Sequence, residues 1–210
     1  EQARRAGAIL GAGVFERFPF VPGAKPATED PEQLILNRTW RPALAVTGAG
    51  GLPALADAGN VLRPATTLRL SLRLPPTVSG EAVGDLLQRL LEADSPFGCR
   101  VRFHATQATT GWNAPPQRQW LTEAVDQASR DYFGQSAAYM GEGGTIPFMG
   151  MLGERFPTAQ FLISGVLGPH ANAHGPNERL HLPTAKRLTA CVAAVIAQHH
   201  RQRPTSVGRP

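Results

Sequence analysis

Side chains that could bind a metal or a substrate are crowded into one short stretch of the sequence. They are His170, Asn172, His174, Asn177 and Glu178. The stretch follows an apolar run at residues 161–167, which is bounded by Gly and Pro and predicts a buried strand. Open α/β sheets place their sites at the carboxyl ends of such strands. We therefore expect a functional site in this loop.

His174, in the sequence AHGPNE, is the sharpest candidate for a metal ligand. A neutral imidazole is the most common metal ligand in proteins, and Glu178 and Asn177 could orient it or contact a substrate. The alternative is a surface loop with a hydrogen-bonded histidine. His170, His174 and His181 are too irregularly spaced to form a zinc site by themselves. A catalytic zinc needs about three protein ligands, and no Cys pair or second acidic cluster lies nearby in the sequence.

Two further features could bind an anion. The glycine-rich sequence GEGGTIP, residues 141–147, lies before a predicted helix, and backbone N–H groups at a helix start suit a carboxylate or phosphate. A tight structural turn is the alternative, and the Gly-Lys-Ser/Thr of a P-loop is missing. Arg73 ends an alternating strand and shares a face with Arg69 and Ser71. It could clamp a carboxylate, although the pattern alone favours a solvated strand face.

Hydrophobic periodicity predicts the elements that must position these residues. Strands are predicted at 34–47, 66–74, 101–106, 137–140 and 161–167, and helices at 3–18, 81–93, 120–133, 148–154 and 185–200. The order strand, strand, helix, strand in the first half indicates an α+β layer, an antiparallel sheet with helices on one face. After a linker at 109–116, alternating strands and helices indicate an α/β unit with a parallel sheet.

The composition excludes several classes of protein. At 210 residues the chain can form one large domain or two small ones, and no apolar run is long enough to span a membrane. The net charge of +5 includes three arginines in the tail and comes with no basic stripe interleaved with aromatics, so we expect no nucleic-acid partner. Two cysteines imply no disulfide framework, and a cytoplasmic location is expected.

Several motifs together carry a family resemblance. The stretches NRTWRPALAVTG, GNVLRP, LRLSLRLPP, GEGGTIPFMGMLGERFP and LISGVLGPHANAHGPNE resemble the M20 metallopeptidases, most closely their dipeptidase and carnosinase branch. The resemblance implies a zinc-bearing α/β catalytic domain interrupted by a ferredoxin-like lid that often forms a homodimer. The domain boundaries expected from it are an incomplete lid at 1–108, the C-terminal part of the catalytic domain at 109–203 and a tail at 204–210.

The resemblance also implies roles for individual residues. His174 matches the last zinc-binding histidine of the family, and Arg73 matches the lid arginine that clamps the substrate carboxylate. Asn60 falls where a polar lid residue reaches the active site of a neighbouring subunit. Gly144 and Thr145 match the loop that binds the carboxylate end of the substrate.

Other parts of the family pattern are missing from this chain. The His-x-Asp motif, the Glu-Glu pair that holds the general base, and the lid histidine do not occur. Together with a first residue that is not Met, this leads us to expect the C-terminal portion of a longer zinc-dependent hydrolase, one that cleaves dipeptides or short peptides and uses two zinc ions. This chain then supplies one zinc ligand and no catalytic residue, and we expect it to be inactive alone. The alternatives are a non-catalytic dimerisation or binding module, or an N-acyl amino acid amidohydrolase of the same family.

Overall fold

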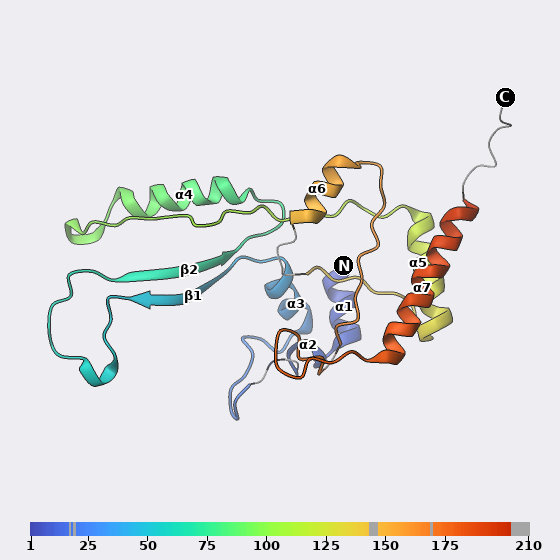
Figure 1. Ribbon diagram of the computed structural model, residues 1–210, viewed down its shortest axis with the longest axis horizontal. Helices are drawn as coiled ribbons and strands as arrows, with labels where there is room; N and C mark the ends of the chain where they lie inside the picture. The colour runs from blue at the N-terminus through green and yellow to red at the C-terminus, as the bar shows by residue number, and fades with distance from the viewer. Residues whose placement is uncertain (17, 19, 143–146, 169, 203–210) are drawn as a thin grey trace. The chain divides into compact units, whose positions relative to one another are not determined.

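The computed structural model describes residues 1–16, 18, 20–142, 147–168 and 170–202, which form two compact units (Figure 1). The first unit contains residues 1–34, 114–140 and 152–210, and the second contains 35–113 and 141–151. The α-helices are α1 (Gln2–Leu10), α2 (Gly13–Glu16), α3 (Pro31–Thr39), α4 (Gly80–Ala93), α5 (Gln119–Phe133), α6 (Pro147–Arg155) and α7 (Leu182–Arg201). The strands are β1 (Ala43–Gly50) and β2 (Thr67–Arg73), and two short 3₁₀ helices lie at Leu55–Asp57 and Pro96–Gly98.

The core of the first unit is the packed pair of helices α5 and α7, which lie side by side in Figure 1. Leu121, Ala124 and Ala128 of α5 are buried against Val195 of α7. Their spacing along α5 puts them on one helical face, as the sequence predicts. Both helices confirm the predicted ones, and α5 ends at Gly134, whose positive φ of 75° closes the helix in the left-handed conformation.

Helix α1 packs closely on the start of α3. A Cβ atom added at Gly7 would lie 3.0 Å from the backbone N of Glu32 and 3.1 Å from the backbone C of Pro31, so a side chain at this position would force the two segments apart. The ion pair between Arg4 and Glu32, at 3.2 Å, spans the same contact. The helix predicted at 3–18 is broken at Gly11 (φ 49°) into α1 and α2, in agreement with the glycines in the sequence.

The second unit contains an antiparallel hairpin of β1 and β2. Its register pairs Ala43 with Arg73, Leu44 with Leu72 and Val46 with Leu70, with an irregularity between Val46 and Gly48. Strand β2 confirms the prediction at 66–74. The strand predicted at 34–47 is wrong in its first half, because α3 occupies residues 31–39. Asp30 caps that helix by accepting a hydrogen bond from the backbone N of Glu32 at 2.9 Å, and Pro31 is its first residue.

Helix α4 confirms the helix predicted at 81–93, and the Ser79 hydroxyl caps its start by accepting a hydrogen bond from the backbone N of Ala82 at 3.3 Å. The strand predicted at 101–106 is wrong, since this extended segment lies along α4 instead of pairing with a strand. The backbone N of Phe103 donates to the Glu92 carboxylate at 2.7 Å, and Gly84 lies against Ala105. The segment therefore meets part of its hydrogen-bonding need through a helix side chain.

The predicted strands at 137–140 and 161–167 are also wrong, because neither segment has a strand conformation in the structure. Ile163 and Leu167 are 57% and 56% exposed, so the apolar run is not buried. A strand needs a hydrogen-bonding neighbour, and the sheet of the described residues contains only β1 and β2. The helix predicted at 148–154 is confirmed by α6.

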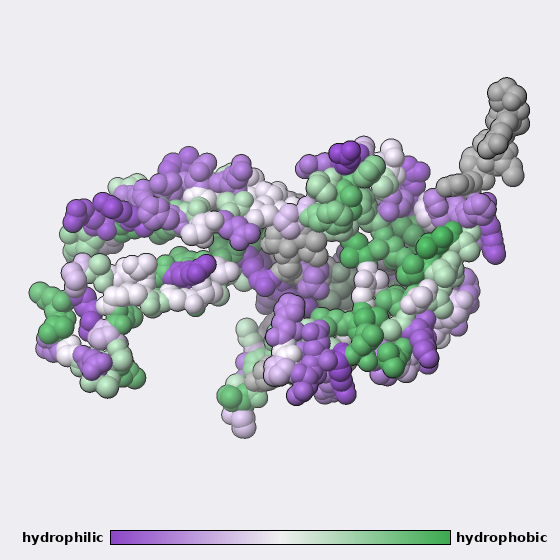
Figure 2. Space-filling model, viewed as in Figure 1, coloured by the Kyte–Doolittle hydropathy of each residue, from purple (hydrophilic) through white to green (hydrophobic). Residues whose placement is uncertain are grey.

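The second unit exposes much of its apolar surface. The alternating leucines of β2 predict one buried face, and this prediction is wrong, because every residue of β2 is exposed. Exposed leucines include Leu68, Leu70 and Leu72 on β2 and Leu86, Leu90 and Leu91 on α4. Figure 2 shows hydrophobic residues, in green, beside hydrophilic ones on the molecular surface. Among the described residues, no helix is long and apolar enough to cross a membrane.

Candidate functional site

The loop that carries His174 lies between the extended segment 159–168 and α7. Four non-glycine residues within eight positions have a left-handed backbone: His170, Asn172, His174 and Asn177, with φ between 52° and 63°. Asparagine tolerates this conformation, but for most other residues it costs about 1–2 kcal/mol. Strain of this kind persists only where surrounding contacts hold the backbone in place.

Hydrogen bonds inside the loop supply those contacts. The backbone N of Gly175 donates to the carbonyl of Asn172 at 3.0 Å, and the Asn172 side chain donates to the carbonyl of Pro176. A Cβ atom at Gly175 would lie 2.8 Å from the Asn172 side-chain amide, so glycine leaves room for this bond. The backbone N of Arg179 donates to the carbonyl of Ala171, and its Nε donates to the carbonyl of His170. Ala171 is buried, while His174 is exposed.

The other predicted site residues lie in the second unit. Arg73 is the last residue of β2 and Asn60 lies in the connection between the 3₁₀ helix and β2, and both are exposed. Alternation along β2 puts Arg73, Ser71 and Arg69 on one face, as predicted. Gly144 and Thr145 lie outside the described residues. His174 thus belongs to one unit, and Arg73 and Asn60 belong to the other.

The donors needed for zinc are present only in part. His174 offers an exposed imidazole, which fits one coordination position of zinc. Within the described residues, however, no group of three or more His, Cys, Asp or Glu side chains is arranged to hold a metal ion. His181, the nearest following histidine, contacts the Thr184 hydroxyl through its Nδ1 at 2.8 Å. The part of the chain that the structure describes therefore does not form a complete zinc site.

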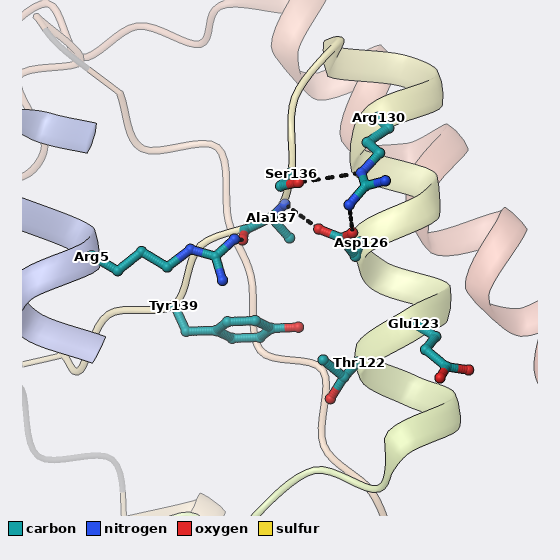
Figure 3. Close-up of a pocket in the computed structure, with 8 residues that line it drawn as sticks. All are labelled: Arg5, Thr122, Glu123, Asp126, Arg130, Ser136, Ala137 and Tyr139. Atoms are coloured by element: carbon teal, nitrogen blue, oxygen red, sulfur yellow. Dashed lines mark hydrogen bonds and ion pairs between the residues drawn. The ribbon is translucent and has the colours of Figure 1, made fainter. Parts of the chain in front are cut away.

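The sequence did not predict a hollow of about 280 Å³ in the first unit, lined by α1, α5 and the segment after α5 (Figure 3). Arg5 of α1 reaches across to donate to the carbonyl of Ala137 at 2.9 Å. Asp126 accepts from the backbone N of Ala137 at 3.0 Å and pairs with Arg130 at 2.5 Å. These residues are up to 132 positions apart in the sequence, so no local sequence motif predicts the hollow.

Tyr139 is the unusual group in this hollow. Its hydroxyl is buried and has no hydrogen-bond partner among the described residues. Burial raises the pKa of Tyr139, the negative charge of Asp126 raises it further, and the charge of Arg5 lowers it. Figure 3 shows the ring lying between Arg5 and α5. The phenol is therefore held in its neutral form, in which it can donate a hydrogen bond.

The chain is similar in sequence to a known dipeptidase. No protein-family model matches the chain. Over 143 residues it is 29% identical to a cysteinylglycine-S-conjugate dipeptidase of Corynebacterium striatum, a match that covers 68% of this chain and 31% of that protein.

Solved structures share its fold. Human carnosine dipeptidase 1 matches with a TM-score of 0.65 and 18% identity, over 90% of this chain and 42% of that one. The M20 family metallo-carboxypeptidase Sso-CP2 of Sulfolobus solfataricus matches with a TM-score of 0.65 and 14% identity, over 90% and 44%. The chain is similar to a dipeptidase in sequence and to M20 enzymes in fold.

A third solved structure is similar to this chain as well. The dipeptidase Dug1p of Saccharomyces cerevisiae matches with a TM-score of 0.62 and 22% identity, over 84% of this chain and 37% of that one. At these identities the structures bear on the fold alone. The chain spans about a third of the length of its sequence relative and about two fifths of the three structures. What the chain has in common with them is a partial M20 fold of mixed helices and a small antiparallel sheet.

Proposed function

We propose that this chain is the C-terminal portion of a zinc-dependent M20 hydrolase that cleaves dipeptides or short peptides with a free carboxylate. The observation that carries the proposal is the 29% identity over 143 residues with a cysteinylglycine-S-conjugate dipeptidase. The fold likeness to two dipeptidases and a metallo-carboxypeptidase supports it. We call the longer polypeptide that contains this chain and the remaining zinc ligands the complete enzyme.

In the complete enzyme, His174 provides one imidazole ligand to zinc from the loop described above. Zinc, when bound, supplies Lewis acidity and an activated water. The general base is expected outside this chain, which holds no Glu-Glu pair. The residues of this chain act by binding: Arg73 pairs with the substrate carboxylate, and Gly144 and Thr145 hold the same end of the substrate.

The hairpin and α4 belong to the proposed ferredoxin-like lid. Both edges of a two-stranded sheet present unpaired backbone groups, which favour pairing with another chain. The exposed leucines of β2 and α4 add an apolar surface. We propose a homodimer formed through this lid, in which Asn60 lies near the site of the neighbouring subunit.

A non-catalytic dimerisation or binding module is the second candidate function. It is favoured by the incomplete set of metal ligands in the described residues. An N-acyl amino acid amidohydrolase of the same family is a third, because such substrates also carry a free carboxylate next to an amide bond. Assays of the complete enzyme with dipeptides and with N-acyl amino acids separate the two hydrolases.

The purified 210-residue chain tests whether the zinc site and the catalytic residues are completed by residues outside it. The chain is loaded with zinc, dialysed, and assayed for bound metal and for hydrolysis of Ala-Ala. We expect no tight stoichiometric zinc and no turnover, because one imidazole cannot replace the three or so ligands that a catalytic zinc needs. Stoichiometric zinc with turnover would mean that the site is complete within this chain and would refute the proposal. A complete enzyme without hydrolytic activity would favour the non-catalytic module.

A further inference from the structure

The loop that carries His174 has few contacts that close it. Besides the bonds internal to residues 172–176, its two ends are joined in the described part of the chain by two hydrogen bonds. The backbone N of Arg179 donates to the carbonyl of Ala171 at 3.0 Å, and the Arg179 Nε donates to the carbonyl of His170 at 3.1 Å. Arg179 therefore hydrogen-bonds two consecutive carbonyls at the start of the loop, eight and nine residues before it in the sequence.

The loop depends on these two hydrogen bonds because its backbone is strained. Four of its residues hold left-handed φ angles, a conformation that few non-glycine residues adopt. Most of the loop is exposed, and Ala171 is its buried residue. Segments with few buried contacts open more easily than helices and strands. A hydrogen bond between the two ends therefore raises the fraction of time in which the loop is closed.

We propose that Arg179 is a positioning residue, which closes the 170–179 loop through its bond to the His170 carbonyl and so fixes where His174 is presented. Arg179 also lines a surface hollow of about 580 Å³ together with Val166 and Leu167 of the segment that leads into the loop. The proposal rests on the proposed role of His174 as a zinc ligand. Arg179 itself is not assigned to contact zinc or substrate.

Two substitutions separate the hydrogen bond from the charge. In glutamine, the side-chain Nε2 is the same number of bonds from Cα as the Nε of arginine, so Arg179→Gln keeps a donor at the required reach without the positive charge. Arg179→Ala removes both, and either variant keeps the backbone bond to Ala171. Arg155→Ala, at the exposed end of α6, is the control for loss of a surface arginine.

The first measurement is amide hydrogen exchange of the zinc-free 210-residue chain, read residue by residue by NMR. Loss of one net hydrogen bond raises the opening equilibrium constant of the loop about fivefold in Arg179→Ala, so a loop that is open about a third of the time exchanges its hydrogen-bonded amides about twice as fast. We expect Arg179→Gln to exchange at about the rate of the unmodified chain, while α5 and α7 are unchanged in all variants. Unchanged loop exchange in Arg179→Ala would overturn the proposal. Equal exchange in the Ala and Gln variants would also overturn it, because the bond would not be the cause.

The second measurement is zinc affinity of the complete enzyme. Zinc binds the closed population, so its affinity in Arg179→Ala falls by the factor by which that population falls, about twofold for the same fivefold shift of the opening equilibrium, at an unchanged melting temperature. If loop exchange rises but zinc affinity equals that of Arg155→Ala, Arg179 holds the loop without positioning the ligand, and the inference fails alone. If His174→Ala leaves zinc affinity intact, the metal assignment itself is wrong. The two failures are therefore distinguishable.

Discussion

Replacing Tyr139 with phenylalanine should stabilise the protein. The hydroxyl has less than 1 Å² of accessible surface and no hydrogen-bond partner among the described residues. A buried polar group without a partner costs about 1–3 kcal/mol relative to its hydrated state in the unfolded chain. Phenylalanine keeps the ring and removes the unpaired group. We expect the free energy of unfolding to rise by about 1 kcal/mol, at the lower end of that range.

Urea denaturation followed by circular dichroism measures this change, and thermal melting should shift upward by about 2–4 °C for a chain of this size. Tyr132→Phe is the matched control, since the chain has two tyrosines and Tyr132 is 42% exposed. An exposed substitution of this kind changes stability by less than about 0.5 kcal/mol. A Tyr139→Phe variant less stable than the unmodified chain would show that the hydroxyl makes a stabilising bond, and would refute the reasoning.

Three more predictions concern pH, the cap of α4 and the substrate clamp. Because burial raises the pKa of Tyr139, the folded protein keeps a proton that the unfolded chain releases above about pH 10. Stability should therefore fall as the pH rises through that range, and urea midpoints measured between about pH 9 and 11 should fall less steeply in Tyr139→Phe. Ser79→Ala should destabilise α4 by about 1 kcal/mol, seen as faster amide exchange in its first turn, whereas Ser95→Ala should have no such effect, as Ser95 makes no side-chain cap bond. In the complete enzyme, Arg73→Ala should raise KM for dipeptides about 10- to 100-fold with little change in kcat, and an equal loss in Arg69→Ala, on the same strand face, would contradict the specific role of Arg73.

The helices could be predicted from the sequence because their signals are local. The apolar spacing of α4 and its Ser79 cap, or the apolar face of α5 and Gly134 after it, depend on neighbours within a few positions. Asp30 and Pro31 also indicate the start of α3, but the leucines and tryptophan that follow have the near-alternating spacing of a strand. The cap residues were the stronger signal there.

The strands could be predicted less well because a strand depends on partners elsewhere. β2 forms because β1 lies beside it, whereas the more apolar segment 161–167 has no strand neighbour in the described residues. The sequence of segment 161–167 shows that it is apolar, but a segment forms a strand only when a second strand hydrogen-bonds to it.

The same contrast between local signals and distant partners applies to the candidate site. Local sequence motifs predict roles for His174 and Arg73, and these roles stay predictions. Arg179 and the Tyr139 hollow emerged only from contacts between segments, so they could not be read from local sequence.

The zinc content of the complete enzyme tests the central claim most directly. The measurement compares the unmodified enzyme with His174→Ala and with His200→Ala, a control at the exposed end of α7. Losing a ligand from a site of three or four weakens metal binding far more than it weakens the fold. The account predicts that His174→Ala loses zinc and turnover after dialysis with an unchanged melting temperature, while His200→Ala keeps both. Full zinc occupancy and turnover in His174→Ala would contradict it.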